Sequence, residues 1–230
     1  MTASRPFLIL LGGDLAPGDR LRRQIAGARV IAADGGMRHA ETLGVTPELW
    51  VGDFDSSDDP LHATWAEVPR QPHPFDKDMT DGELAVEEAL ARGADALVLA
   101  GALGGARSDH AVHNLLHGAA LAARGLPVVM TSGTEEAWPL VIGPQHFDLP
   151  AGTLFSVLAF TDLAGLTLEG VDWPLSERDV ALGQSLTLSN RVAGDNHAGI
   201  DVTLRAGTAV LVARPGERSE AVPHRRDPRY

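Results

Sequence analysis

Short apolar segments alternate with longer segments of helical periodicity between residues 7 and 131, and this alternation limits the possible folds most strongly. The apolar segments are 7–11, 29–33, 49–51, 96–100 and 128–131, and the helical segments are 19–28, 37–43, 80–92 and 109–124. Strands that alternate with helices predict βαβ units and a mostly parallel sheet that is covered on both faces. Because ligands of such sheets bind outside the carboxyl ends of the strands, we expect the functional residues just after the strands.

From about residue 145 the pattern changes to short β-rich segments separated by Gly, Pro, Asn and Asp. These segments are 153–160, 165–168, 185–189, 199–204 and 209–212. The predicted fold is therefore α/β, with an N-terminal, mostly parallel sheet and flanking helices in residues 1–140. An all-β domain resembling a sandwich or barrel follows in residues 145–214. Residues 215–230 are polar, without an apolar period, and predict a flexible tail.

The net charge of −12 argues against nucleic acid as the main partner, because binding a phosphate backbone requires a basic surface. The chain has no cysteine, which excludes disulfides and thiolate metal ligands. The first residues lack the charged and apolar regions of a signal peptide, and no apolar run approaches the roughly 20 residues that cross a membrane. We therefore expect a cytoplasmic protein that binds neither nucleic acid nor a membrane.

Four turns are rich in acidic residues or glycine: three follow predicted strands and one leads into a predicted helix. They are 33–36 (ADGG), 52–56 (GDFDS), 74–81 (PFDKDMTD) and 101–110 (GALGGARSDH). In an extended chain Asp53 and Asp55 point the same way, about 6–7 Å apart. Like charges at that spacing repel each other unless a cation or a proton lies between them. Each turn alone is compatible with an ordinary exposed loop, but the four together predict a ligand site at one edge of the sheet.

Oxygen ligands without cysteine suit Mg²⁺, which takes one or two carboxylates together with substrate phosphates. Lys77 and Arg107 would supply positive charge to the phosphates, Arg107 through its bidentate guanidinium. The residues alone therefore predict a magnesium–nucleotide site for phosphoryl-type transfer. Thr80 and Glu83 have the spacing of a capping box, so a helix is expected to begin here with Asp81 in its first turn.

A zinc site is an alternative, because His113 and His117 lie one helical turn apart. No HExxH motif accompanies them, however, and histidines on a helix face more often pack or face solvent. A serine hydrolase is not indicated, since the sequence has no G-x-S-x-G motif.

The four turns, in this order and spacing, resemble those of the thiamine pyrophosphokinases. The resemblance continues in residues 165–175 (GLTLEGVDWPL) and 188–190 (LSN), which are similar to the thiamine-domain motifs of that family, and it spans residues 7 to 213 approximately. It implies an α/β catalytic domain, a β-sandwich-like domain and a homodimer with the active site at the subunit interface. It also implies Mg²⁺-dependent transfer of the β,γ-pyrophosphoryl group of ATP to the hydroxyl of thiamine, giving thiamine diphosphate and AMP.

The resemblance also assigns roles to residues at matching positions. The expected catalytic residues are Asp34, Asp53, Asp55, Asp81 and Arg107. Of these, Asp53, Asp55 and Asp81 are expected to hold Mg²⁺, and Asp34 to lie nearer the reacting hydroxyl. The expected ATP-binding residues are Gly35, Gly36, Asp76, Lys77, Asp78, Thr80, Gly104, Gly105 and Arg107. The expected thiamine-binding residues are Asp109, Trp173, Ser189 and Asn190.

Trp173 is the expected wall of the thiamine pocket, because aromatic rings attract cations such as the thiazolium. Ser189 and Asn190 are expected to act from the partner subunit. Residues 191–199 are longer and more polar than the family pattern, which leaves the contacts after Asn190 open.

Two other functions are compatible with the motifs. The first is a pyrophosphokinase for another small alcohol, such as a hydroxymethylpterin, and the second is a non-enzymatic sensor of nucleotide or thiamine. The motifs around Trp173 and Asn190 favour thiamine as the acceptor. The full set of aspartates argues against a sensor, because binding alone does not require so many metal-binding carboxylates.

Overall fold

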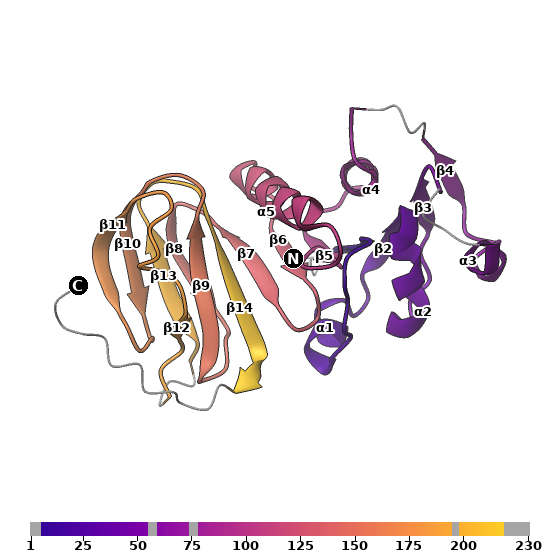
Figure 1. Cartoon of the computed structure of the whole chain (residues 1–230). Helices are drawn as coiled ribbons and strands as arrows, with labels where there is room; N and C mark the ends of the chain where they lie inside the picture. The colour runs from indigo at the N-terminus through magenta and orange to yellow at the C-terminus, as the bar shows by residue number, and fades with distance from the viewer. Residues whose placement is uncertain (1–5, 55–58, 74–77, 195–197, 219–230) are drawn as a thin grey trace. The chain divides into compact units, whose positions relative to one another are not determined.

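The computed structural model describes residues 6–54, 59–73, 78–194 and 198–218 (Figure 1). The contacts between residues divide the chain into two compact units, Met1–Val141 and Ile142–Tyr230. Among the described residues, no helix is both long and apolar enough to span a membrane.

The first unit is built on a parallel sheet, as predicted. Its central strands are β1 (Phe7–Leu10), β2 (Arg29–Ala33), β3 (Leu49–Gly52), β5 (Leu97–Ala100) and β6 (Val128–Thr131). They lie in the order β6-β5-β1-β2-β3, and every neighbouring pair is parallel. Strand β4 (Arg70–Pro72) extends the sheet beside β3, and β7 (Glu136–Leu140) pairs antiparallel with β6. Sequence analysis did not predict these two added strands.

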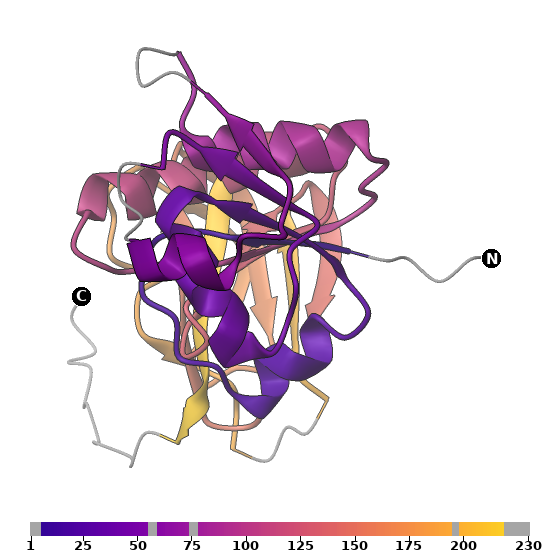
Figure 2. The same cartoon turned by 90° about the vertical axis from the view of Figure 1, so that its right-hand side faces the viewer.

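Helices cover both faces of this sheet, which explains why four consecutive residues of β1 are all buried. The helices are α1 (Asp19–Gln24), the 3-10 helix η1 (Asp34–Arg38), α2 (His39–Leu43), α3 (Asp59–Thr64), α4 (Asp81–Ala91) and α5 (Ser108–Ala123). Helices α4 and α5 lie on one face, and α1 and α2 lie on the other (Figure 2). The predicted capping box begins α4: the Thr80 hydroxyl accepts from the Glu83 backbone N–H, and the Glu83 carboxylate accepts from the Thr80 backbone N–H.

An ion network joins segments at the amino ends of the parallel strands. Arg29 donates two hydrogen bonds to the Glu48 carboxylate, at 2.9 and 2.7 Å, and Arg92 donates a third at 2.9 Å. The Arg29 guanidinium also lies 4.4 Å from the centre of the Phe7 ring. The largest effect on the pKa of Glu48 is the hydrogen bond from Arg29, which lowers it. The network therefore connects β1, β2, β3 and the end of α4 at the edge opposite the predicted site.

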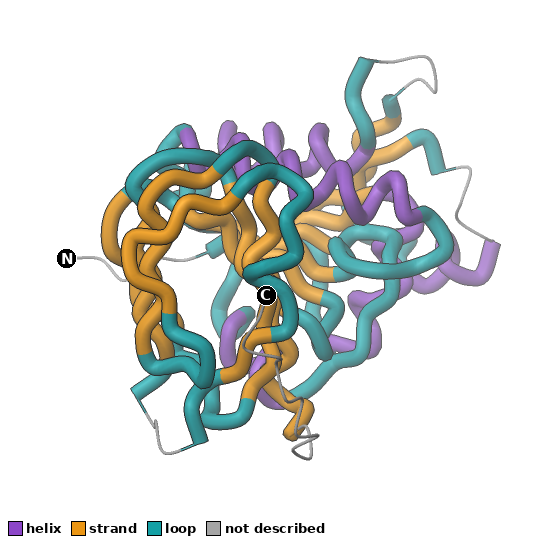
Figure 3. The backbone as a smooth tube through the Cα atoms, turned by 60° about the vertical axis from the view of Figure 1, so that its left-hand side comes forward, coloured by secondary structure: helices purple, strands orange, loops and turns teal. Residues whose placement is uncertain are grey.

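The second unit is an antiparallel sandwich. One layer contains β11 (Leu175–Val180), β10 (Leu163–Glu169), β13 (Ile200–Leu204) and β8 (Gly143–Phe147), in that order. The other layer pairs β9 (Thr153–Ala159) with β14 (Ala209–Arg218) and with β12 (Asn190–Arg191). Loops join these strands (Figure 3). Burial alternates along β13, as expected for strands with one face in a core.

Two predictions for this unit need correction. Residues 185–189 form turns instead of a β-rich segment, and only Asn190–Arg191 pairs with β9. Instead of a continuous ladder, Thr187 makes two bonds to Val157 of β9: its hydroxyl donates to the Val157 carbonyl (2.7 Å), and its carbonyl accepts from the Val157 N–H (3.0 Å). Strand β14 continues to Arg218, so residues 215–218 of the predicted tail belong to a strand. Residues 219–230 lie outside the described part of the chain.

Candidate active site

Three of the predicted aspartates converge at the carboxyl ends of the strands. Asp34 follows β2, Asp53 follows β3, and Asp81 is the first residue of α4. Each offers a carboxylate oxygen within 4.8 Å of those of the other two, and all three are half-buried. Carboxylates this close repel one another, and a bound cation relieves the repulsion. An oxygen-only donor set of this kind suits a hard divalent cation such as Mg²⁺, so these residues fit the expected metal.

Close backbone packing brings the first two aspartates together. Asp34 has a φ of 42°, in the left-handed region that residues other than glycine rarely occupy. A Cβ on Gly52 would lie 3.0 Å from the Asp34 Cβ, so glycine allows the end of β3 to approach Asp34. A Cβ on Gly36 would lie 2.2 Å from the Leu10 carbonyl oxygen, so η1 can pack against β1 only with glycine here. Gly35, like Gly36, is buried.

The segment expected to bind ATP is described in part. Asp55, Asp76 and Lys77 lie outside the described residues, so their predicted roles remain predictions. Asp78 is exposed, and Thr80 caps α4. Because the N-terminus of a helix carries partial positive charge, α4 favours anionic groups around Asp81.

The glycine-rich loop after β5 packs against the loop after β1. Gly104 and Gly105 have φ values of 72° and 94°, which glycine adopts without strain. A Cβ on Gly105 would lie 3.2 Å from the Gly13 Cα, and a Cβ on Gly13 would lie 2.4 Å from the Gly101 carbonyl oxygen. The two loops therefore contact each other through backbone atoms at the same edge of the sheet as the aspartates.

Arg107 and Asp109 form a bidentate ion pair where α5 begins. Arg107 Nε donates to Asp109 Oδ1 at 3.0 Å, and Arg107 Nη2 donates to Asp109 Oδ2 at 2.7 Å. These hydrogen bonds hold the pKa of the Asp109 carboxyl well below its usual range, although both side chains are exposed. Sequence analysis assigned Arg107 to phosphate and Asp109 to thiamine. A ligand that binds to Arg107 or Asp109 must therefore bind beside this ion pair or break it.

Sequence analysis missed the loop after β1 and the residues that fasten it. Arg38 Nη2 donates to the carbonyls of Gly12 and Gly13, and His39 Nε2 lies 2.9 Å from the Gly13 carbonyl oxygen. Burial is the largest effect on the pKa of His39 and lowers it, which favours the neutral ring. Because a carbonyl only accepts, His39 Nε2 carries the proton. The Gly12–Asp14 sequence (GGD) after the first strand is similar to the other acidic, glycine-rich turns and is the signal that could have identified this loop.

In the described part of the chain, the geometry around His113 and His117 does not favour the alternative of a zinc site. The His113 and His117 rings stack with centroids 5.9 Å apart, and Glu83 Oε2 lies 3.7 Å from His113 Nε2. Within the described ranges, the ligand atoms close enough to hold a metal together are those of Asp34, Asp53 and Asp81.

The second unit brings together three of the residues expected to bind thiamine. Asn190 Nδ2 donates to the Trp173 carbonyl at 2.9 Å, and Asn190 Oδ1 accepts from the N–H groups of Trp173 (3.2 Å) and Arg191 (2.8 Å). Asn190 is buried and Trp173 half-buried. Ser189 is exposed, with a φ of 57°, and its N–H donates to the Ser156 hydroxyl at 3.0 Å. The Asn190 side chain therefore fixes the backbone that carries Trp173.

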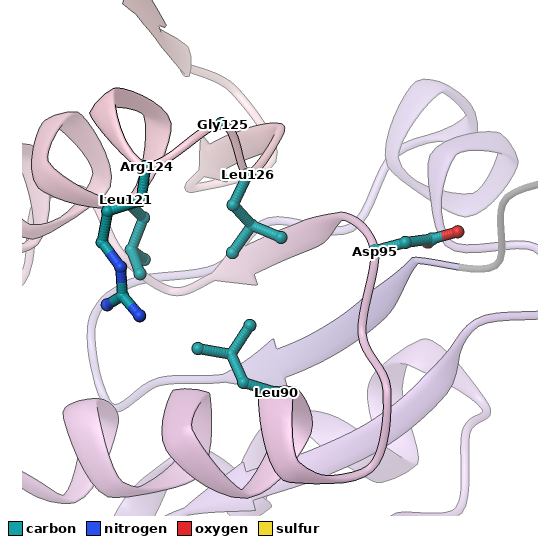
Figure 4. Close-up of a pocket in the computed structure, with 6 residues that line it drawn as sticks. All are labelled: Leu90, Asp95, Leu121, Arg124, Gly125 and Leu126. Carbon is teal, nitrogen blue, oxygen red and sulfur yellow. The ribbon is translucent and has the colours of Figure 1, made fainter.

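A cavity of about 290 Å³ lies between the C-terminal ends of α4 and α5 (Figure 4). It is lined by Leu90, Asp95, Leu121, Arg124, Gly125 and Leu126. Leu90 is nine residues beyond Asp81 along α4, which corresponds to roughly 13 Å of helix rise. The cavity is therefore separate from the aspartate cluster, and sequence analysis predicted none of its residues as functional.

Two family models match this chain in succession. The model described as the catalytic domain of thiamin pyrophosphokinase matches residues 25–130, and the model of its vitamin B1 binding domain matches residues 145–208. The chain is also similar to the thiamine pyrophosphokinase of Bacillus subtilis (strain 168). The two are 26% identical over 170 residues, which cover 70% of this chain and 77% of the relative.

Solved structures share the fold. The thiamine pyrophosphokinase from Bacillus subtilis has a TM-score of 0.81 at 22% identity, covering 93% of this chain and 100% of that one. A thiamin pyrophosphokinase family protein from Enterococcus faecalis has a TM-score of 0.77 at 23% identity, with the same coverage. The thiamin pyrophosphokinase from Candida albicans has a TM-score of 0.76 at 14% identity, covering 92% and 89% of the two chains. Since the two family models together match about three quarters of the chain, it belongs to the thiamin pyrophosphokinase family and is an enzyme of that class.

Proposed function

We propose that this enzyme transfers the β,γ-pyrophosphoryl group of ATP to the hydroxyl of thiamine in a Mg²⁺-dependent reaction, giving thiamine diphosphate and AMP. The observation that carries the proposal is the convergence of Asp34, Asp53 and Asp81 at the carboxyl ends of the strands. The match of residues 145–208 to a vitamin B1 binding domain supports thiamine over a pterin alcohol as the acceptor.

Asp53 and Asp81 would hold Mg²⁺, together with Asp55, directly or through water. When bound, the cation neutralises charge on the phosphate oxygens. Asp34, the third member of the cluster, would orient the thiamine hydroxyl or accept its proton, which requires hydrogen-bond contact. Arg107 and Lys77 would bind phosphate oxygens, and Arg107 would then exchange its bond to Asp109 for bonds to the nucleotide. The chain mainly positions the two substrates, as in other phosphoryl-type transfers.

Trp173 would form one wall of the thiamine site, because its ring attracts the cationic thiazolium. Asn190 would keep that wall in place through its bonds to the Trp173 backbone. We also propose a cytoplasmic homodimer in which Ser189 and Asn190 complete the active site of the partner subunit.

The proposal is tested by incubating the purified protein with ATP, Mg²⁺ and thiamine and measuring AMP, ADP and thiamine diphosphate by chromatography. AMP and thiamine diphosphate should form in equal amounts and only when both metal and thiamine are present. Asp53→Asn should lower the rate by at least about 100-fold, because Asp53 is proposed to hold the metal itself. Asp19→Asn, which changes an exposed aspartate on α1, should leave the rate unchanged. ADP as the product, or AMP formed only with a pterin alcohol, would contradict the proposal.

A further inference from the structure

Trp50 lies in β3, three residues before Asp53, and its side chain is fully buried. Its indole Nε1 donates a hydrogen bond of 2.9 Å to the carbonyl oxygen of Asp34. The φ of Asp34, 42°, lies in the left-handed region. An isolated chain rarely holds that conformation at an aspartate, so surrounding contacts must maintain it. The indole N–H is one such contact, and it acts directly on the Asp34 backbone.

The Trp50 ring also supports the segment that carries Asp53. Phe54 follows Asp53 and packs against Trp50 edge to face, with ring centroids 5.1 Å apart. Phe54 has a φ of 65°, so the backbone on both sides of the cluster adopts left-handed conformations beside the same indole. One buried side chain thus contacts Asp34 through its N–H and the neighbour of Asp53 through its ring.

Two further side chains hold the indole in place. The Arg70 guanidinium lies 5.0 Å from the centre of the Trp50 ring and 5.9 Å from that of Phe54. Arg70 also donates a 3.0 Å hydrogen bond to the His62 carbonyl, and the His62 ring stacks on Trp50 with centroids 5.0 Å apart. Segments from β3, α3 and β4 therefore fix the orientation of Trp50.

We infer that Trp50 is a positioning residue for the aspartate cluster: its N–H fixes the Asp34 backbone, and its ring fixes Phe54 and, through it, Asp53. The inference rests on the metal site proposed above. Groups that orient metal ligands typically change metal affinity by 10–100-fold when they are replaced. A tryptophan that only filled the core would change stability without a separate effect on metal affinity, so the two roles are distinguishable.

Binding of Mn²⁺ alone provides a measurement that does not depend on turnover. We would follow the loss of the free Mn²⁺ electron paramagnetic resonance signal, with and without α,β-methylene-ATP, in the full-length protein. Trp50→Phe keeps an aromatic ring but removes the N–H donor. Leu97→Val is the matched control, because Leu97 is a buried residue at the start of β5, at the opposite edge of the sheet. Trp50→Phe should raise the Mn²⁺ Kd at least about tenfold. Leu97→Val should change the Mn²⁺ Kd less than about twofold, although the two variants are expected to lose similar amounts of Tm.

A second variant separates the hydrogen bond from the volume of the ring. Site-specific Trp50→3-benzothienylalanine keeps the fused rings and replaces the N–H by sulfur, so it should weaken Mn²⁺ binding with little change in Tm. The same replacement at Trp138, in β7, should leave the Mn²⁺ Kd unchanged. Wild-type Mn²⁺ affinity in folded Trp50 variants would overturn the inference while leaving the metal site intact. A wild-type protein that binds no Mn²⁺ would overturn the metal site itself, and this inference with it.

Discussion

Replacing Asn190 by alanine should destabilise the β-sandwich and weaken thiamine binding through one mechanism. The buried side chain makes hydrogen bonds of 2.8, 2.9 and 3.2 Å to backbone groups of Trp173 and Arg191. At about 0.5–1.5 kcal/mol net for each bond, with the longest at the low end, Asn190→Ala should cost about 2–3 kcal/mol of folding free energy. For a chain of this length that corresponds to a fall in Tm of roughly 5–10 °C.

The assay combines urea unfolding with steady-state kinetics. If Asn190 acts by holding Trp173, Asn190→Ala should raise the KM for thiamine and leave the KM for ATP unchanged. Ser185→Ala, an exposed change near the same turn, serves as the control.

A double-mutant cycle then tests the mechanism. Once Trp173→Ala has removed the ring, the further Asn190→Ala change should have little additional effect on the KM for thiamine, because the residue acts through Trp173. Fully additive effects in the double variant would refute this reasoning and would indicate a direct contact between Asn190 and the substrate.

Three other predictions concern the first unit. Arg20→Met should cost about 2 kcal/mol in urea unfolding, because the buried Glu136 carboxylate loses its bond from Arg20 and keeps the one from the Gln24 amide. Arg20→Met/Glu136→Leu should recover most of the loss, and equal losses in both variants would contradict this explanation. Gly36→Ala should lower the Tm by more than about 5 °C or prevent folding, because its Cβ would meet the Leu10 carbonyl, whereas Gly18→Ala, with open space around it, should be tolerated. The hydrogen bond from Arg29 is the main cause that lowers the pKa of Glu48 in the folded protein. The ionised Glu48 carboxylate therefore stabilises the fold above its pKa in the unfolded chain, about 4.3, and this stabilisation is lost as the pH falls through its pKa in the folded protein. Glu48→Gln should therefore reduce stability at pH 7 more than at pH 3, and an equal effect of Glu67→Gln, at an exposed position, would refute that explanation.

The central sheet and the aspartate cluster could be predicted because their signals are local. Apolar runs mark strands such as β1 and β5, and Thr80 with Glu83 marks the start of α4. The fixed geometry of a parallel sheet then places the residues after each strand at one edge.

Strand β4 gave no such signal. Its three residues, RQP, are exposed or half-buried, and it becomes a strand only because β3 offers an edge with which it pairs. The left-handed conformation of Asp34 and the indole bond from Trp50 could not be predicted either, since both depend on the close approach of two segments separated in the sequence. The same holds for the bond from the Asn190 side chain to the Trp173 carbonyl, which joins residues 17 positions apart; the predicted contact of Asn190 with thiamine stays a prediction.

Charged residues at the two ends of the parallel strands act in opposite ways on the stability of the fold. At the amino ends of the strands, the Glu48 carboxylate attracts the guanidinium groups of both Arg29 and Arg92 and so holds neighbouring segments together. At the carboxyl edge, Asp34, Asp53 and Asp81 repel one another until a cation arrives. Without a bound cation, the carboxyl ends of the strands are therefore electrostatically less favourable than the amino ends, and they are the place where the substrates are proposed to bind.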